Sequence, residues 1–97
     1  MAIWSRPTIE FSVFGPIAVA DLPGLHARLN AQLRERGAPV IIVCWLVDVQ
    51  ADAVAVDALA RLRLCARRQD SKLRVHNASA DLVALIALVG LDDVLGV

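Results

Sequence analysis

The sequence lacks an excess of charge of either sign, a cysteine framework and any metal-binding motif. Its 97 residues contain 10 Lys and Arg against 10 Asp and Glu, a formal net charge of +0. This balance argues against a nucleic-acid-binding protein, which needs surplus cations to displace counterions from phosphates. The two cysteines, Cys44 and Cys65, lie in apolar contexts without a Cys-x-x-Cys spacing, so we expect neither a disulfide framework nor a redox pair.

The sequence also lacks a hydrophobic run of membrane-spanning length. Its longest apolar stretches, residues 38–47 and 82–91, fall well short of the roughly 20 residues that a transmembrane helix needs, and acidic residues bound them. No apolar run follows Arg6, so we expect no signal peptide. Together these absences predict a cytoplasmic protein that does not insert into a membrane.

The residues that most enzymes use are scarce and scattered. His26 and His76 fall on different predicted elements, and neither has a second His or a Cys at metal-ligand spacing. The five glycines are dispersed as turns and caps and form no phosphate-binding loop. No serine lies in a strand–turn–helix elbow. We therefore predict a protein that is not an enzyme and has no metal and no cofactor.

What the sequence does contain is apolar surface. Hydrophobic residues make up 58% of the chain and the mean hydropathy is +0.61, enough to form a core within one domain over residues 1–97, with the core beginning at about residue 9. Apolar runs over residues 8–14, 40–49 and 72–76 predict strands. Helical patterns follow over 22–36, 52–69 (including a short connection) and 80–89, and residues 93–97 are expected to form a short last strand or coil.

Single helices between short strands require crossover connections, which predict an α/β fold. We expect one small domain with a mixed, largely parallel sheet and helices packed on it. The run over Val40–Val49 is continuously apolar up to its Asp48, whereas a strand with one solvated face would alternate. It therefore predicts a central strand covered on both faces.

Each predicted helix carries a stripe of apolar residues that we expect to face the core. The third helix is also apolar on its opposite side, at Val83 and Ala87. A helix that is apolar all round is buried on both sides or covered by a partner, and packing of the tail would also account for it. The three stripes are Leu22, Leu25, Leu29 and Leu33; Ala55, Leu59, Leu62 and Ala66; and Leu82, Leu85, Ile86 and Val89.

Acidic residues mark the start of the second helix. Asp48 ends the central strand, and we place Asp52 and Asp57 before or inside the first helical turn. Open α/β sheets put their functional sites at this edge. Capping alone also explains a carboxylate at a helix start, where it stabilises the helix by roughly 0.3–1 kcal/mol. Both interpretations stay open.

The outer face of the second helix has the composition of a protein-docking patch. With its apolar stripe inward, Asp57 and Arg61 fall on the outer side at i,i+4 spacing, which favours an ion pair. Leu64 lies on the same side among arginines, a pattern that favours contact with a protein partner. The predicted partner-binding residues are Asp52, Asp57, Arg61, Leu64 and Arg68.

Several segments together resemble the STAS domain, the fold of the bacterial anti-sigma factor antagonists. They are GPIAVADLPGLHARL from Gly15, the strand VIIVCWLVDV, the helix VDALARLRLCARR, the strand KLRVHNAS and the ending VGLDDVL. The resemblance runs from Ile9 to Val97. It implies an interaction module whose partner is an anti-sigma factor that is also a kinase.

In that family an Asp-Ser-Ser-Gly-Leu segment opens the second helix and is phosphorylated on serine or threonine by the partner. Aligning Gly-Leu with Ala58-Leu59, with a one-residue gap upstream, puts Asp57 at the phosphorylated position. No Ser or Thr lies between Phe14 and Asp70. The resemblance therefore implies an anti-anti-sigma factor that is not phosphorylated at the usual site, with Asp57 as a permanent charge. Asp57 as a simple helix anion in a domain that has lost its switch is the alternative.

Two other functions stay open. The first alternative, within the same fold, is a STAS accessory subunit of a transporter or lipid-trafficking complex. The second, from a different class, is a small Mg²⁺-dependent receiver-like phosphoacceptor that uses Asp48, Asp52 and Asp57, although the lysine expected near a strand end is missing. A homodimer is a further open alternative for the partner.

Overall fold

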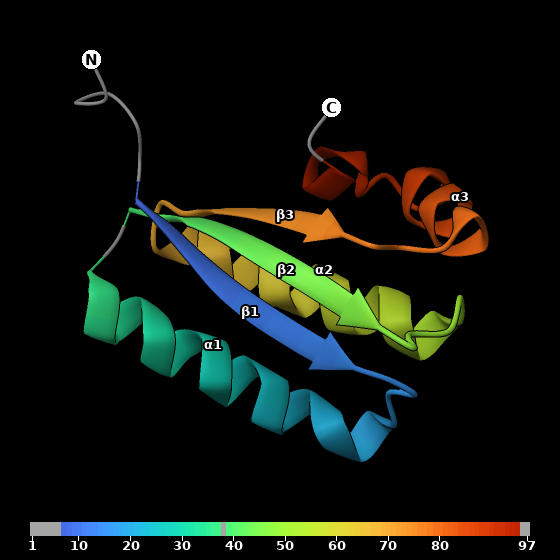
Figure 1. Ribbon diagram of the computed structural model, residues 1–97, viewed down its shortest axis with the longest axis horizontal. Coiled ribbons are helices and arrows are strands. Elements are labelled where there is room, and N and C mark those ends of the chain that lie inside the picture. Colours follow the sequence, from blue (N-terminus) through green and yellow to red (C-terminus); the bar gives the residue numbers. More distant parts are fainter. Residues whose placement is uncertain (1–6, 38, 96–97) are drawn as a thin grey trace.

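The computed structural model describes residues 7–37 and 39–95 (Figure 1). The predicted order of strands and helices is confirmed, and the expectations for residues 1–6, 38 and 96–97 lie outside this range. Along the chain the elements are β1 (Thr8–Phe14), the 3₁₀ turn η2 (Val19–Asp21), α1 (Leu22–Arg36), β2 (Ile41–Val47), α2 (Ala53–Arg68), β3 (Lys72–His76), α3 (Ala80–Leu88) and the 3₁₀ helix η3 (Asp92–Leu95).

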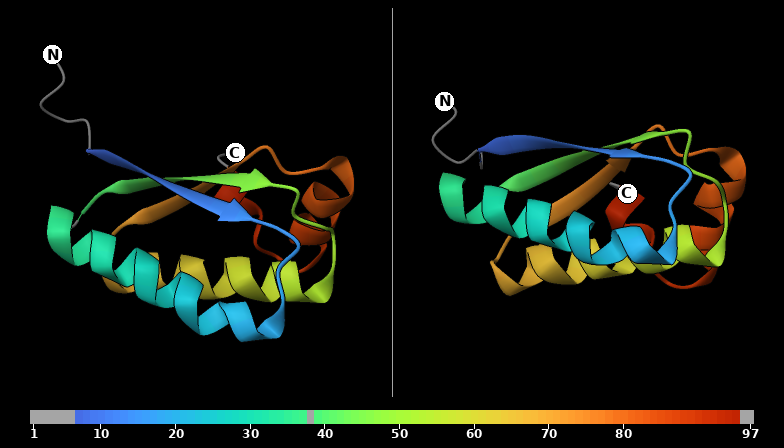
Figure 2. Two further views of the ribbon diagram at one scale, coloured as in Figure 1. Left: turned by 60° about the horizontal axis from the view of Figure 1, so that its bottom comes forward. Right: turned by 90° about the horizontal axis from the view of Figure 1, so that it is seen from below.

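The three strands form one sheet in the order β1-β2-β3, and both pairs are parallel. The α/β prediction is confirmed, with the difference that the described sheet is wholly parallel rather than mixed. Because successive strands are added in one direction through right-handed crossovers, α1 and α2 lie on the same face of the sheet. Figure 2 shows both helices beneath the strands.

The core lies between the sheet and these two helices. The residues of β1 that face it are Ile9, Phe11 and Val13, and those of β2 are Ile42, Cys44 and Leu46. The predicted leucine stripe of α1 and the predicted stripe of α2 are buried at all eight positions. The periodicities of 2 and 3.6 residues thus identified the inward faces of β1, α1 and α2 correctly.

The prediction that β2 is covered on both faces is wrong. The side chains of β2 that point away from the helices are half-buried at Ile41 and Val43, and 40% of Trp45 is exposed. The physical reason is the winding of the chain: both crossover helices pack on one side, so the second apolar face of β2 is left without a described covering element.

The ends of the helices follow local capping chemistry. Gly37, with a φ of 76°, ends α1. Asp21 occupies the N-cap of α1, but its carboxylate accepts a hydrogen bond from the Ala18 amide (2.8 Å) in the preceding turn. Ser79 is the N-cap of α3: its Oγ accepts from the Leu82 amide at 3.2 Å.

The third helix and the tail differ from expectation. Of the predicted α3 stripe, Leu82 and Ile86 are buried, whereas Val89 is exposed. Residues 92–95 form a 3₁₀ helix instead of a strand or coil, and its Val94 is fully buried. No helix in the described ranges is long and apolar enough to cross a membrane.

Candidate docking surface on the second helix

The connection from β2 to α2 accounts for two of the predicted acidic residues. Asp48, directly after β2, is exposed and has a φ of 56°. Asp52 is the N-cap of α2, and its Oδ1 accepts a hydrogen bond from the Ala55 amide at 2.9 Å. Capping thus engages one of the Asp52 oxygens, as in any well-capped helix.

The position of Asp57 differs from the prediction. Because α2 begins at Ala53, Asp57 is its fifth residue and lies in the second turn, not before or inside the first. The Asp52 cap starts the helix a full turn earlier than the alignment with the family segment requires. The Asp57 carboxylate is half-exposed and pairs with Arg61 Nε at 3.1 Å, which confirms the expected i,i+4 ion pair.

The predicted outer face of α2 exists as one surface. Asp57, Arg61, Leu64 and Arg68 are all exposed, and Leu64 exposes 48% of its surface. The structure therefore brings four of the five predicted partner-binding residues to one side of α2, with Asp52 at the beginning of the helix. We refer to Asp57, Arg61, Leu64 and Arg68 as the α2 surface.

A hollow flanks the α2 surface on each side. One, of about 400 Å³, lies between α1 and α2, and the other, of about 460 Å³, lies between α2 and α3. The first is lined by Leu22, Pro23, His26, Arg61, Leu64, Cys65 and Arg68. The second is lined by Ala53, Val56, Asp57, Ala60, Leu85, Val89 and Leu91. The α2 surface is thus a ridge between two hollows, a shape to which a protein of complementary shape can bind.

Sequence reasoning missed the contributions of α1 and α3 to this relief. Pro23 and His26 of α1 line the first hollow, although the sequence pattern gave no link between these residues and α2. The predicted order of strands and helices did contain a signal for the α1 contribution, because consecutive crossover helices on one face of a parallel sheet are neighbours.

Neither cysteine thiol is suited to nucleophilic chemistry. Burial raises the pKa of the Cys44 thiol to about 12, and the charge of Arg28 opposes this rise only in part. Burial also raises the pKa of the Cys65 thiol, against a smaller opposing effect of Arg68. Both side chains are free thiols that stay protonated near neutral pH and act as small core residues.

Metal-ligating side chains are not clustered in the part of the chain that the structure describes. No group of three or more His, Cys, Asp and Glu residues there could hold a metal ion. Asp52 is engaged by a backbone amide and Asp57 by Arg61. The arrangement that the receiver-like alternative requires of Asp48, Asp52 and Asp57 is therefore not assembled.

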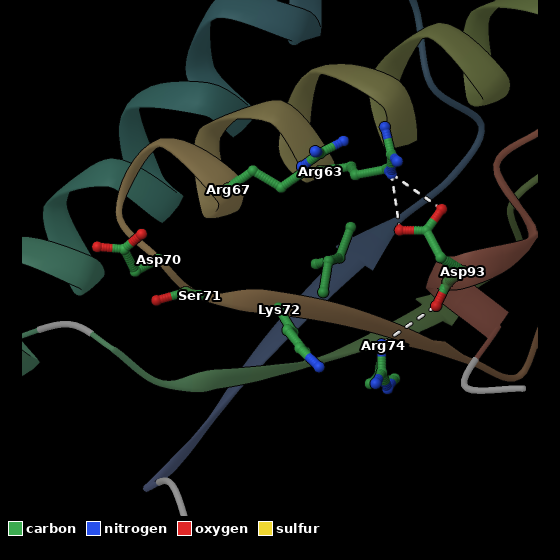
Figure 3. Close-up of a pocket in the computed structure, with 8 residues that line it drawn as sticks. Arg63, Arg67, Asp70, Ser71, Lys72, Arg74 and Asp93 are labelled. Atoms are coloured by element: carbon green, nitrogen blue, oxygen red, sulfur yellow. Dashed lines mark hydrogen bonds and ion pairs between the residues drawn. The ribbon is translucent and has the colours of Figure 1, made fainter.

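A third hollow, of about 650 Å³, lies at the outer edge of β3 and was not foreseen (Figure 3). The sequence did hold a signal, because six of the 10 cations fall between residues 61 and 74: Arg61, Arg63, Arg67, Arg68, Lys72 and Arg74. Arg63 Nε bonds both carboxylate oxygens of Asp93 (3.0 and 2.8 Å), and Arg74 donates to the Asp93 carbonyl (3.1 Å). Two of these cations thus fasten η3 to α2 and β3.

Comparison with known proteins adds no assignment. No protein-family model matches the chain, and a search of curated proteins finds no match. Membership of the STAS family therefore stays a prediction that rests on the sequence pattern.

Proposed function

We propose that this protein is a non-catalytic interaction module of the anti-sigma factor antagonist type. It acts in the cytoplasm and docks through the α2 surface to a protein partner of the anti-sigma factor and kinase type. The observation that carries the proposal is the α2 surface itself: an exposed leucine, an ion pair and an arginine on one ridge between two hollows.

The chemistry of the ridge fits recognition by contact. A few residues near the centre of a patch, arginine and large aromatic side chains above all, supply most of the binding energy of protein interfaces. The Asp57–Arg61 pair presents both charges in a fixed geometry to a partner. Leu64 adds apolar area that the partner removes from water on binding.

Asp57 gives the surface a permanent negative charge. A phosphoserine carries about −1.5 to −2 charges at neutral pH and can be removed, whereas the carboxylate supplies one charge that no phosphatase changes. In the second turn of α2, the helix dipole favours this charge less than it would at the N-terminus, so Arg61 is its main stabilising neighbour. We infer constitutive rather than switched binding.

Replacing Asp57 with serine is expected to create a phosphate acceptor on the α2 surface. With candidate anti-sigma factor kinases and labelled ATP, we expect transfer to Asp57→Ser and none to the wild type. Asp81→Ser is the matched control, because Asp81 is also an exposed aspartate and lies on α3, away from the proposed surface. If neither the wild type nor Asp57→Ser binds or accepts phosphate from any such kinase, the kinase-type partner is excluded.

Replacing Leu64 with aspartate is expected to weaken partner binding by about tenfold or more, because it puts an unpaired charge at the centre of the buried contact. Titration calorimetry against the purified partner measures the effect, and circular dichroism verifies folding. Leu88→Asp is the matched control, since Leu88 is 81% exposed and lies on α3. Equal binding of the wild type and Leu64→Asp would remove α2 as the docking element.

One observation favours the second candidate, an accessory subunit of a transporter or lipid-trafficking complex. Helix α3 exposes Val83, Leu88 and Val89, and no described element covers these side chains. An apolar helix face of this kind is typical of a subunit held in a larger assembly. Stable co-purification with a permease or ATPase subunit that Leu88→Asp abolishes and Leu64→Asp preserves would favour this function over the first.

A further inference from the structure

The face of the sheet opposite α1 and α2 is apolar along its centre and has no cover within the described residues. Figure 2 shows the strands lying open on this side. A continuous apolar run such as that of β2 is typical of a strand buried on both faces, yet only one face of β2 is packed. We refer to the outward side chains as the open face; its apolar members are Phe14, Ile41, Val43, Trp45 and Val47.

Trp45 forms a flat platform at the centre of the open face. Its Nε1 donates to Glu10 Oε1 on β1 at 3.1 Å, and its ring centroid lies 4.9 Å from that of His76 on β3. The indole is therefore fixed from both neighbouring strands while 40% of the residue stays exposed. A rigid aromatic surface of this kind loses little conformational entropy when a partner covers it.

The charges of the open face are separated across the sheet. Glu10 lies on β1, and the cations Lys72 and Arg74 lie on β3. In Figure 3 the Lys72 and Arg74 side chains point to the side of β3 opposite Arg63 and Arg67 of α2. The strand register aligns Glu10 with Val43 of β2 and Val43 with Arg74, so these three residues form one row across the sheet.

This row is complementary to itself under a two-fold rotation. An axis parallel to β2, midway between two facing sheets, keeps each row at its own level and exchanges β1 with β3. Val43 then faces the partner's Val43, and Glu10 faces the partner's Arg74, twice in the dimer. Sheets that pack face to face lie about 10 Å apart with nearly aligned strands, a gap that glutamate and arginine side chains span together.

We propose that the open face binds a second copy of this chain, forming a two-fold dimer with sheet packed on sheet. The apolar residues of β2 form the centre of the interface, and the Glu10–Arg74 pairs form its two rims. Most soluble oligomers have this closed symmetry, in which one patch meets itself. The dimer supplies the second cover that the apolar run of β2 lacks within one chain.

The size of the open face sets the expected strength. Three strands about 4.8 Å apart and five to seven residues long outline a face of roughly 15 by 20 Å. Pairing two such faces removes roughly 600 Å² or more from water in total, the size of a weak, transient interface. We therefore expect a dissociation constant on the order of 10–100 µM. The dimer does not depend on the proposed function, because the α2 surface lies on the other side of the molecule and stays free.

Sedimentation velocity over a concentration series tests the dimer. The wild type is expected to pass from monomer to dimer in the stated range, and Val43→Lys is expected to stay monomeric because it sets two unpaired cations against each other at the centre. Leu88→Lys is the matched control, an equally drastic change of an exposed apolar residue outside the open face, and is expected to dimerise like the wild type.

Charge reversal at the two rims tests the symmetry. Glu10 is exposed and accepts from Trp45, and Arg74 is half-buried and donates to the Asp93 carbonyl, so circular dichroism first verifies the fold of each variant. Glu10→Lys and Arg74→Glu are each expected to weaken the dimer by about tenfold or more, because each creates two like-charge contacts. The double variant restores opposite charges and is expected to dimerise within about threefold of the wild type.

A wild type that stays monomeric at about 1 mM overturns the proposal and assigns the open face to another occupant. A dimer that Leu88→Lys abolishes and Val43→Lys preserves also overturns it, because the interface then lies on α3. A double charge reversal weaker than both single variants excludes the proposed axis.

Discussion

Replacing Phe11 with alanine is expected to lower the free energy of unfolding by about 4 kcal/mol. Phe11 lies at the middle of β1, is 1% exposed and belongs to the core between the sheet and the helices. Removing a buried phenyl ring forfeits its transfer energy and leaves a cavity, which together cost roughly 3–5 kcal/mol. The change also removes the contact of the Arg28 guanidinium with the ring, 4.7 Å from its centroid.

Phe14→Ala is the matched control in the same strand. Phe14 has the same side chain but is 67% exposed, so we expect its loss to change the free energy of unfolding by less than about 1 kcal/mol. Urea denaturation of both variants at low micromolar concentration, below the range expected for the proposed dimer, measures the difference. Equal losses for the two variants would contradict the one-sided burial of β1.

Local sequence pattern was sufficient to predict the three strands, the three long helices and the inward faces of β1, α1 and α2. In β1 and α1 the apolar residues recur with the period of a strand and of a helix, and the residues at that period are buried. They are Ile9, Phe11 and Val13 in β1 and Leu22, Leu25, Leu29 and Leu33 in α1. The outer face of α2 followed from the same geometry, because fixing the inward stripe fixes the opposite side. These features depend only on neighbours within one element.

Features that depend on how helices and strands pack against one another could not be predicted from the local sequence pattern. The composition of β2 indicated apolar surroundings on both faces, but it carries no information on whether the same chain provides both. Likewise, the distance of Asp57 from the start of α2 depends on which aspartate caps the helix, and Asp48, Asp52 and Asp57 were all suitable candidates by residue type. Predicting the hollows beside α2 requires knowing how α1, α2 and α3 are placed relative to one another, which the sequence pattern does not give.

The two exposed surfaces of the molecule have different origins. The α2 surface is polar around one leucine, and its charges are arranged by helix geometry. The open face is apolar along β2, with its charges at the rims. Because the two surfaces lie on opposite sides of the sheet, the proposed dimer and the proposed partner contact would not compete for the same surface. A dimer would then present two α2 surfaces to its partner, which raises the effective concentration of the second contact.

Replacing Gly15 with alanine is expected to lower the free energy of unfolding by about 3 kcal/mol, through overpacking at the loop that carries the α2 cap. A Cβ on Gly15 would overlap the Asp48 carbonyl oxygen and lie 2.7 Å from the Val49 Cα, both backbone atoms. The Gly15 amide also donates to the Val47 carbonyl at 2.7 Å, which holds the two loops together. Relief of the clash must therefore move the β2–α2 connection that ends in Asp52.

Gly24→Ala separates this clash from the general effect of replacing a glycine. Gly24 lies in the first turn of α1, and a Cβ there meets nothing within 4 Å. Alanine is the better helix former, so this variant is expected to gain up to about 1 kcal/mol. Urea denaturation of both variants gives opposite signs if the close approach of Gly15 to Asp48 is real. The shift would pass to the start of α2, where Asp52 caps the Ala55 amide. Gly15→Ala is therefore also expected to weaken the hydrogen-exchange protection of that amide. Unchanged protection would mean that the Gly15 loop does not influence the start of α2.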